Sequence, residues 1–141
     1  MSTTTENKSV VEEFIQALFT RGELDAVEHY LAPDFVNHDP LPSVAPDREG
    51  FRETARAFRV AFPDWSSALK ELIAEGDLVA ERFLAQGTHR GEIMGVAPTG
   101  RKVALAGINI FRLKDGKIIE RWGRLDDLGF LQQLGVMSQA S

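Results

Sequence analysis

The hydrophobic period of this chain changes near residue 63. Between Glu6 and Pro63 apolar residues recur every three or four positions, whereas from Trp65 onward they occur in extended runs separated by tight turns. A step of three to four residues aligns apolar side chains into one stripe only on a helix, and alternation aligns them on one face of a strand. The order of these patterns predicts a single α+β domain over residues 1–141, with helices packed on one face of a sheet.

The helical part predicts three helices. The first covers residues 6–21, a shorter second helix stops ahead of Pro33, and the third begins at an Asp47 cap and ends at Pro63. The segment between the second and third helices, residues 32–47, holds four of the six prolines. It is expected to form either a loop or a strand fragment followed by a loop.

The second part predicts a four-stranded antiparallel meander. Residues 65–75 and 77–89 flank a Glu-Gly-Asp turn, and residues 102–113 and 117–126 flank a Lys-Asp-Gly turn. A short helix follows, with Asp127 as its expected N-cap. A curved sheet of this kind over three helices leaves a cone-shaped cavity, and apolar concavities with a few polar groups are typical ligand sites.

Charge and composition exclude several classes of partner. The net charge is −5 and the basic residues form no long cluster, so no nucleic-acid partner is expected. There is no cysteine for a disulfide or a thiolate site. The N-terminus is polar and no apolar run approaches a membrane span. We therefore expect a cytoplasmic protein without a membrane partner, disordered over residues 1–5.

The three histidines do not form a metal-ligand pattern. No His-x-His or His-x-x-x-His pair is present, and neither a Gly-x-Ser-x-Gly elbow nor a nucleotide-binding glycine motif occurs. We therefore expect no metal and no cofactor. His38, in a proline-rich segment, and His89, at the end of the second predicted strand, are candidate site residues. The alternatives are an Asx-type turn at His38 and an exposed strand end at His89.

A carboxylate near the C-terminus is the main candidate for chemistry. Glu120, Trp122, Arg124 and Asp126 alternate along the last predicted strand and therefore share one face. That face is either solvated or lines the cavity. A carboxyl group inside a cavity has a raised pKa, which suits a general base. The alternative is that Asp126 or Asp127 caps the last helix.

Five segments in this order resemble a known family: LAPDFVNHDP, AFPD, EGDLVAERFLAQGTHRGEIMGVAPTGRKV, FRLKDGKIIERW and DDLGFLQQLG. Together they resemble the SnoaL-like polyketide cyclases, in the superfamily of ketosteroid isomerase and nuclear transport factor 2. The resemblance implies a cone-shaped α+β barrel without metal or cofactor, and an intramolecular aldol condensation that closes a polyketide ring. In the family an Asp four residues after the Trp of the last strand is the general acid/base, which implies this role for Asp126, with His38 near the substrate.

The same resemblance directs attention to a substrate-binding set. His38 or Asn109 could donate a hydrogen bond to the developing oxyanion. Arg124 either contacts the substrate or pairs with Asp126, and His89 is expected at the rim. Aromatic residues would provide flat apolar walls, with core packing as the alternative: Phe35, Phe58, Phe62, Trp65 and Trp122.

Two other functions remain open from the sequence: an isomerase or epoxide hydrolase on the same scaffold, and a ligand-binding domain without catalysis. The partner is expected to be a small hydrophobic, polyketide-like molecule. A homodimer or homotetramer is expected because apolar residues are predicted on the outer face of the sheet: Leu84, Ile108, Ile110 and Leu125.

Overall fold

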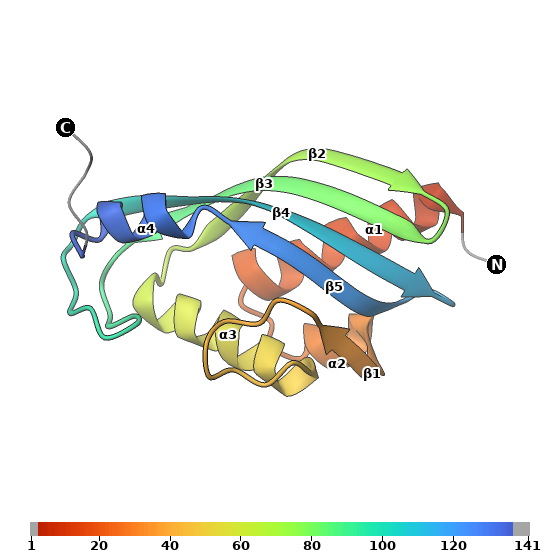
Figure 1. Ribbon diagram of the computed structural model, residues 1–141, viewed down its shortest axis with the longest axis horizontal. Coiled ribbons are helices and arrows are strands. Elements are labelled where there is room, and N and C mark those ends of the chain that lie inside the picture. The colour runs from red at the N-terminus through yellow and green to blue at the C-terminus, as the bar shows by residue number, and fades with distance from the viewer. Residues whose placement is uncertain (1–2, 137–141) are drawn as a thin grey trace.

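A computed structural model describes residues 3–136, in which a curved five-stranded sheet is packed against helices on its concave side (Figure 1). The helices are α1 (Thr4–Ile15), which continues as a π-helical stretch, η1 (Gln16–Thr20), then α2 (Ala26–Tyr30), α3 (Arg48–Ala61) and α4 (Asp127–Gln133). The strands are β1 (Leu31–Asn37), β2 (Ser66–Glu75), β3 (Leu78–Thr88), β4 (Lys102–Lys114) and β5 (Lys117–Leu125). The predicted α+β class is confirmed.

The N-terminal helix begins earlier than predicted. Thr3 caps α1, because its side-chain oxygen accepts the N–H of Glu6 at 3.0 Å. Residues 4 and 5 therefore lie in the first helical turn, and the expected disorder is wrong for residues 3–5. Met1 and Ser2 lie outside the described residues.

The sheet contains a fifth strand, β1, in the segment for which the sequence predicted either a loop or a strand fragment followed by a loop. Its order is β1-β5-β4-β3-β2, with β2 to β5 forming the predicted antiparallel meander and β1 pairing parallel to β5. Strand β1 lies at the sheet edge, where Pro33 removes no ladder hydrogen bond from a central strand. The pairing aligns Asn37 with Arg121. It therefore brings the loop after β1 next to the end of β5.

Odd-numbered residues of β3 and β4 face the helices. Glu81 and Asn109 are buried on this inner face of β3 and β4. A register shift between Arg112 and Leu113 accompanies the pairing of β4 with β5, and Arg121 of β5 is buried as well. The helices thus cover the opposite face of β5 from the one predicted to line a cavity.

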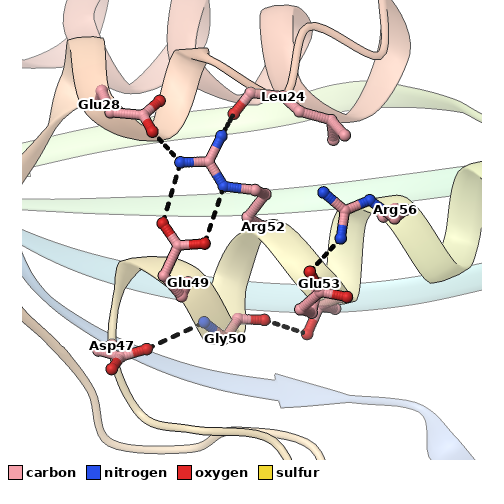
Figure 2. Close-up of polar contacts among 9 residues, drawn as sticks. Leu24, Glu28, Asp47, Glu49, Gly50, Arg52, Glu53 and Arg56 are labelled. Carbon is pink, nitrogen blue, oxygen red and sulfur yellow. Dashed lines mark hydrogen bonds and ion pairs between the residues drawn. The ribbon is translucent and has the colours of Figure 1, made fainter.

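Helix α3 is anchored at its start and along its exposed side. Asp47 caps it by accepting the N–H of Gly50 at 3.0 Å, as predicted. Figure 2 shows Arg52 reaching from α3 to the α2 region, where its guanidinium donates to the Leu24 carbonyl oxygen at 3.0 Å and contacts Glu28. The residues Phe51, Ala55 and Phe58 on the other side of α3 are buried against the rest of the core. These anchors hold α3 under the sheet.

Candidate active site

A cavity of about 500 Å³ lies between the inner face of the sheet and the helices. This volume is within the range of small-molecule sites in proteins, roughly 300–1,000 Å³. Most of its surface is apolar, so it favours a hydrophobic ligand of moderate size. Its large apolar lining residues include Phe19, Phe51, Phe58, Trp65, Phe83 and Leu105.

One wall of the cavity is polar and crosses three neighbouring strands. Asn109 Nδ2 donates to Glu81 Oε1 at 2.9 Å, and Arg121 Nε donates to Asn109 Oδ1 at 2.9 Å. The exposed fractions of Glu81, Asn109 and Arg121 are 0%, 6% and 8%, and all three residues line the cavity. This Glu81–Asn109–Arg121 row is a buried, hydrogen-bonded polar feature of the cavity.

Sequence reasoning identified Asn109 but not its two partners. A signal for Glu81 was present, since Val79, Glu81, Phe83 and Ala85 alternate on one face of β3, and a lone carboxylate among apolar residues on a core face is unusual. Arg121 carried a weaker signal, because the inward face of β5 could not be chosen without the structure.

Arg121 also fastens the loop after β1. Its Nη1 donates to Asn37 Oδ1 at 3.1 Å and to the Asp39 carbonyl oxygen at 2.9 Å. Gly123 N in turn donates to Asp39 Oδ2 at 2.9 Å, and Arg124 Nη1 lies 2.7 Å from Asp39 Oδ1. The Gly123 N–H and then Arg124 hold the pKa of Asp39 below its ordinary value. Both carboxylate oxygens of Asp39, at the edge of the cavity, are therefore already bound by other groups.

Glu81 has the opposite electrostatics. Burial raises its pKa above the ordinary value, although the hydrogen bond from Asn109 and the charge of Arg121 act against this. Its Oε2 is buried and has no hydrogen-bond partner among residues 3–136. Glu81 therefore combines a perturbed pKa with a free oxygen, a pairing that is frequent at functional sites.

The predicted catalytic pair, His38 and Asp126, does not meet in this cavity, and neither residue lines it. The His38 ring stacks on Trp122 with centroids 4.7 Å apart, and its Nε2 lies 2.8 Å from Glu120 Oε2. Trp122 and Glu120 alternate with the inward Arg121, so this group lies on the other face of β5.

Asp126 is the N-cap of α4. Its Oδ1 accepts the N–H of Gly129 at 3.0 Å, whereas Asp127, the expected cap, lines the cavity. Strand β5 ends at Leu125, so strand alternation does not extend to Asp126. The expected convergence of Asp126 and His38 on one cavity is therefore wrong in geometry.

The predicted substrate-binding set divides into two groups. Phe58, Trp65, Asn109 and Arg124 line the cavity. Arg124 pairs there with Asp39 and not with Asp126.

The remaining members of that set lie elsewhere. Phe35 and Phe62 are buried in the core, and Trp122 lies on the outer face. His89 is fully buried and not at the rim. Its Nδ1 accepts the N–H of Thr99 at 3.2 Å, and its ring centroid is 5.5 Å from that of Phe62. These four residues therefore have core or surface contacts in place of a cavity position.

No group of three or more His, Cys, Asp or Glu side chains within residues 3–136 could hold a metal ion. In the same part of the chain no helix has the length and apolar character needed to cross a membrane.

A curved, open sheet that wraps over helices, with an apolar cavity and a buried polar wall, places the chain among small α+β proteins whose cavities suit small molecules. The profile of the family described as SnoaL-like polyketide cyclase matches residues 9–134. The chain therefore belongs to the SnoaL-like polyketide cyclase family, as the sequence predicted.

Two relatives are methyl ester cyclases by name. The nogalonic acid methyl ester cyclase of Streptomyces nogalater is 29% identical over 120 residues, which cover 83% of this chain and 89% of the relative. The aklanonic acid methyl ester cyclase AcmA of Streptomyces galilaeus is 28% identical over a gapped alignment of 142 positions, which covers 92% of this chain and 91% of the relative.

Solved structures extend the comparison to the fold. TsrD from Streptomyces laurentii superposes with a TM-score of 0.87 at 28% identity, over 97% of this chain and 100% of TsrD. IdmH from Streptomyces antibioticus gives a TM-score of 0.79 at 36% identity, over 92% of this chain and 99% of IdmH. The fold is thus shared over nearly the whole length of both proteins.

Proposed function

We propose that this protein closes a carbon ring in a polyketide or a related small hydrophobic keto ester by intramolecular aldol condensation, without a cofactor. The observation that carries the proposal is the apolar cavity of about 500 Å³ with a hydrogen-bonded polar row on one wall. The two cyclases named above, both of which take methyl esters according to their names, support a substrate of this chemistry.

The chemistry needs little from the protein. A base removes the acidic hydrogen between two carbonyl groups, and the enolate delocalises the resulting charge. The enolate carbon then attacks a ketone carbon of the same molecule, a carbon–carbon bond forms, and the new alkoxide takes up a proton. The protein must supply the base, exclude bulk water and hold the two carbons near each other. N–H donors on the polar wall would stabilise the developing oxyanion.

The site residues predicted from the sequence contribute unequally to this proposal. Trp65 and Phe58 offer aromatic walls, and Asn109 provides an amide at the polar row. His38 and Asp126 are retained only as alternatives that a mutation must decide, because neither lines the cavity.

Turnover of a polyketide-like β-keto methyl ester with a ketone in reach of ring closure tests the function. The expected result is a cyclised product detected by mass spectrometry, faster than in buffer. Binding without cyclisation, followed through tryptophan fluorescence in a Trp122→Phe variant so that only Trp65 reports, would contradict the proposal and favour a ligand-binding domain. Products of epoxide opening or double-bond migration from matched substrates would favour the hydrolase or isomerase alternatives.

A cavity-filling pair ties turnover to the site. Ala85 lines the cavity and Ala106 is exposed on the outer face of the neighbouring strand. Ala85→Phe is expected to lower turnover because the added ring occupies substrate space, whereas Ala106→Phe should not. Melting is measured for both, because overpacking costs about 1–3 kcal/mol. Equal turnover by a folded Ala85→Phe variant would move the reaction away from this cavity.

We also propose a homo-oligomer, most simply a dimer, formed through the outer face of the sheet. Ile108 and Ile110 are 50% and 39% exposed there. Leu125, expected on the same face, lines the cavity and does not contribute. Two exposed isoleucines side by side on neighbouring positions of one strand face support burial against a second copy.

A further inference from the structure

Three carboxyl groups line the cavity within the described residues, and they differ in availability. Both oxygens of Asp39 are engaged by Gly123 and Arg124. Asp127 is exposed at the start of α4. Glu81 alone is fully buried with one free oxygen. The cavity therefore contains one carboxyl group that is desolvated and has an oxygen not used in a structural contact.

The hydrogen bonds of the row fix which oxygen is free. A guanidinium can only donate, so Asn109 must direct its oxygen to Arg121 and its amide group to Glu81. Glu81 Oε1 is consequently an acceptor in either protonation state. The proton of a neutral Glu81 must then reside on Oε2, the same atom that accepts a proton when the group is ionised.

The row has no evident need for a carboxylate as a structural element. Arg121 donates through Nε to Asn109 and through Nη1 to Asn37 and the Asp39 backbone, and none of these hydrogen bonds involves Glu81. A buried carboxyl with an unused oxygen costs folding free energy. The cost is better explained by a task at Oε2 than by packing.

We propose that Glu81 is the proton-transferring residue of this cavity, with Asn109 and Arg121 as positioning residues. The assignment rests on the proposed function. It places the general base on β3, at Glu81, and not at Asp126 between β5 and α4.

The proton balance closes without a co-reactant. Glu81 Oε2 takes the proton from the acidic carbon, and the electron pair of that C–H bond becomes the enolate. After the enolate carbon has attacked the ketone, Oε2–H returns the proton to the new alkoxide. The row keeps Oε1 bound to Asn109 throughout, so only Oε2 changes its protonation state.

Charged groups around Glu81 set the expected pH dependence. Arg121 of β5 favours the ionised form from the end of the row, and Asp39 and Arg124 lie beyond it and act on Arg121. Burial outweighs these effects and raises the pKa of Glu81. Because the base must be ionised, the rate should fall as pH decreases through this raised pKa and level off above it.

The experiment compares wild type, Glu81→Gln and a matched control, Glu71→Gln, on the neighbouring strand, where Glu71 is an exposed partner of Arg82. Two rates are measured with a β-keto methyl ester: ring closure, and exchange of the α-hydrogen for deuterium in D2O above the buffer rate. Glu81→Gln should lower both by roughly 10²- to 10⁴-fold, the usual effect of losing a general base, and should abolish the low-pH decline. Glu71→Gln should match wild type.

The outcomes separate the two proposals. Glu81-dependent exchange without ring closure would sustain the role of Glu81 and overturn the cyclase proposal. Ring closure or exchange at wild-type rates in Glu81→Gln would overturn only the role of Glu81. If the variant does not fold, infrared titration of wild type decides. A carboxyl band that titrates above the usual glutamate range and shifts on binding a β-diketone is expected, and an unchanged band overturns the role.

Discussion

At Asp126 the chain leaves β5 and enters α4, and the carboxylate accepts the N–H of Gly129. Asp126→Ala should therefore destabilise the protein by about 1 kcal/mol, the usual cost of losing an N-cap, and Asp126→Asn by a few tenths because Asn also caps well. Both variants should keep turnover within about twofold of wild type, since their fold and cavity are unchanged. Urea unfolding and ring-closure rates measure the two effects.

The same variants test the role of general base that the family resemblance implied for Asp126. A folded Asp126→Asn protein that lost roughly 10²-fold or more in turnover would restore Asp126 as the general base. Equal turnover would remove it.

Gly123 allows the polar row to form. A Cβ at this position would lie 2.1 Å from Arg121 Nη2 and 2.7 Å from Asn109 Oδ1. Gly123→Ala should force the guanidinium away from Asn109 and cost about 1–3 kcal/mol, as overpacking usually does. Turnover should fall together with stability, because Asn109 loses the contact that orients its amide. Unchanged stability and turnover would show that Arg121 can move freely and does not position the row.

Helix α3 carries several charged contacts. Figure 2 shows two arginines on it with different surroundings: Arg52 contacts Glu28, Glu49 and the Leu24 carbonyl oxygen, whereas Arg56 contacts only Glu53. The side chain of Arg52 is 14% exposed and that of Arg56 is 46% exposed. Arg52 therefore links α3 to α2, whereas Arg56 contacts a residue of its own helix.

Arg52→Gln and Arg56→Gln therefore form a matched pair. The first should cost about 1–3 kcal/mol, because charge-assisted hydrogen bonds of a largely buried group are lost. The second should change stability by less than about 0.5 kcal/mol, as exposed ion pairs usually do. Chemical unfolding at low ionic strength measures both. Equal effects would mean that the link between α2 and α3 adds nothing to the stability of the fold.

For the whole molecule, the outer face of the sheet is expected to determine the oligomeric state. If Ile108 and Ile110 are buried against a second copy, light scattering should give at least twice the mass of one 15.6 kDa chain at micromolar concentration. Ile108→Lys should shift this mass toward the monomer, because an unpaired charge in an apolar interface is strongly unfavourable. Ile73→Lys, at a 65% exposed position of the edge strand β2, is the control. A wild-type mass of one chain would contradict the dimer.

Periodicity and turn residues, read without any structure, were enough for the helices, the four-stranded meander and the α+β class. They act over a few residues: the Phe51, Ala55 and Phe58 stripe makes α3 amphipathic whatever lies opposite, and a tight turn pairs the strands on either side of it. The order of five short segments was also sufficient to predict the family. Asn109 was predicted as a hydrogen-bond donor to the developing oxyanion, from the mechanism that the resemblance implies.

The inward face of β5 was decided only by tertiary structure. Alternation shows which residues share a face but not which face meets the helices, and it stops where the strand stops, at Leu125. The parallel pairing of β1 and the row from Glu81 to Arg121 likewise depend on strands from distant parts of the chain. Pairing, register and packing bring such residues together through contacts that no local pattern contains. Local sequence patterns thus determined the helices and strands of this protein, and long-range packing decided which carboxyl groups line its cavity.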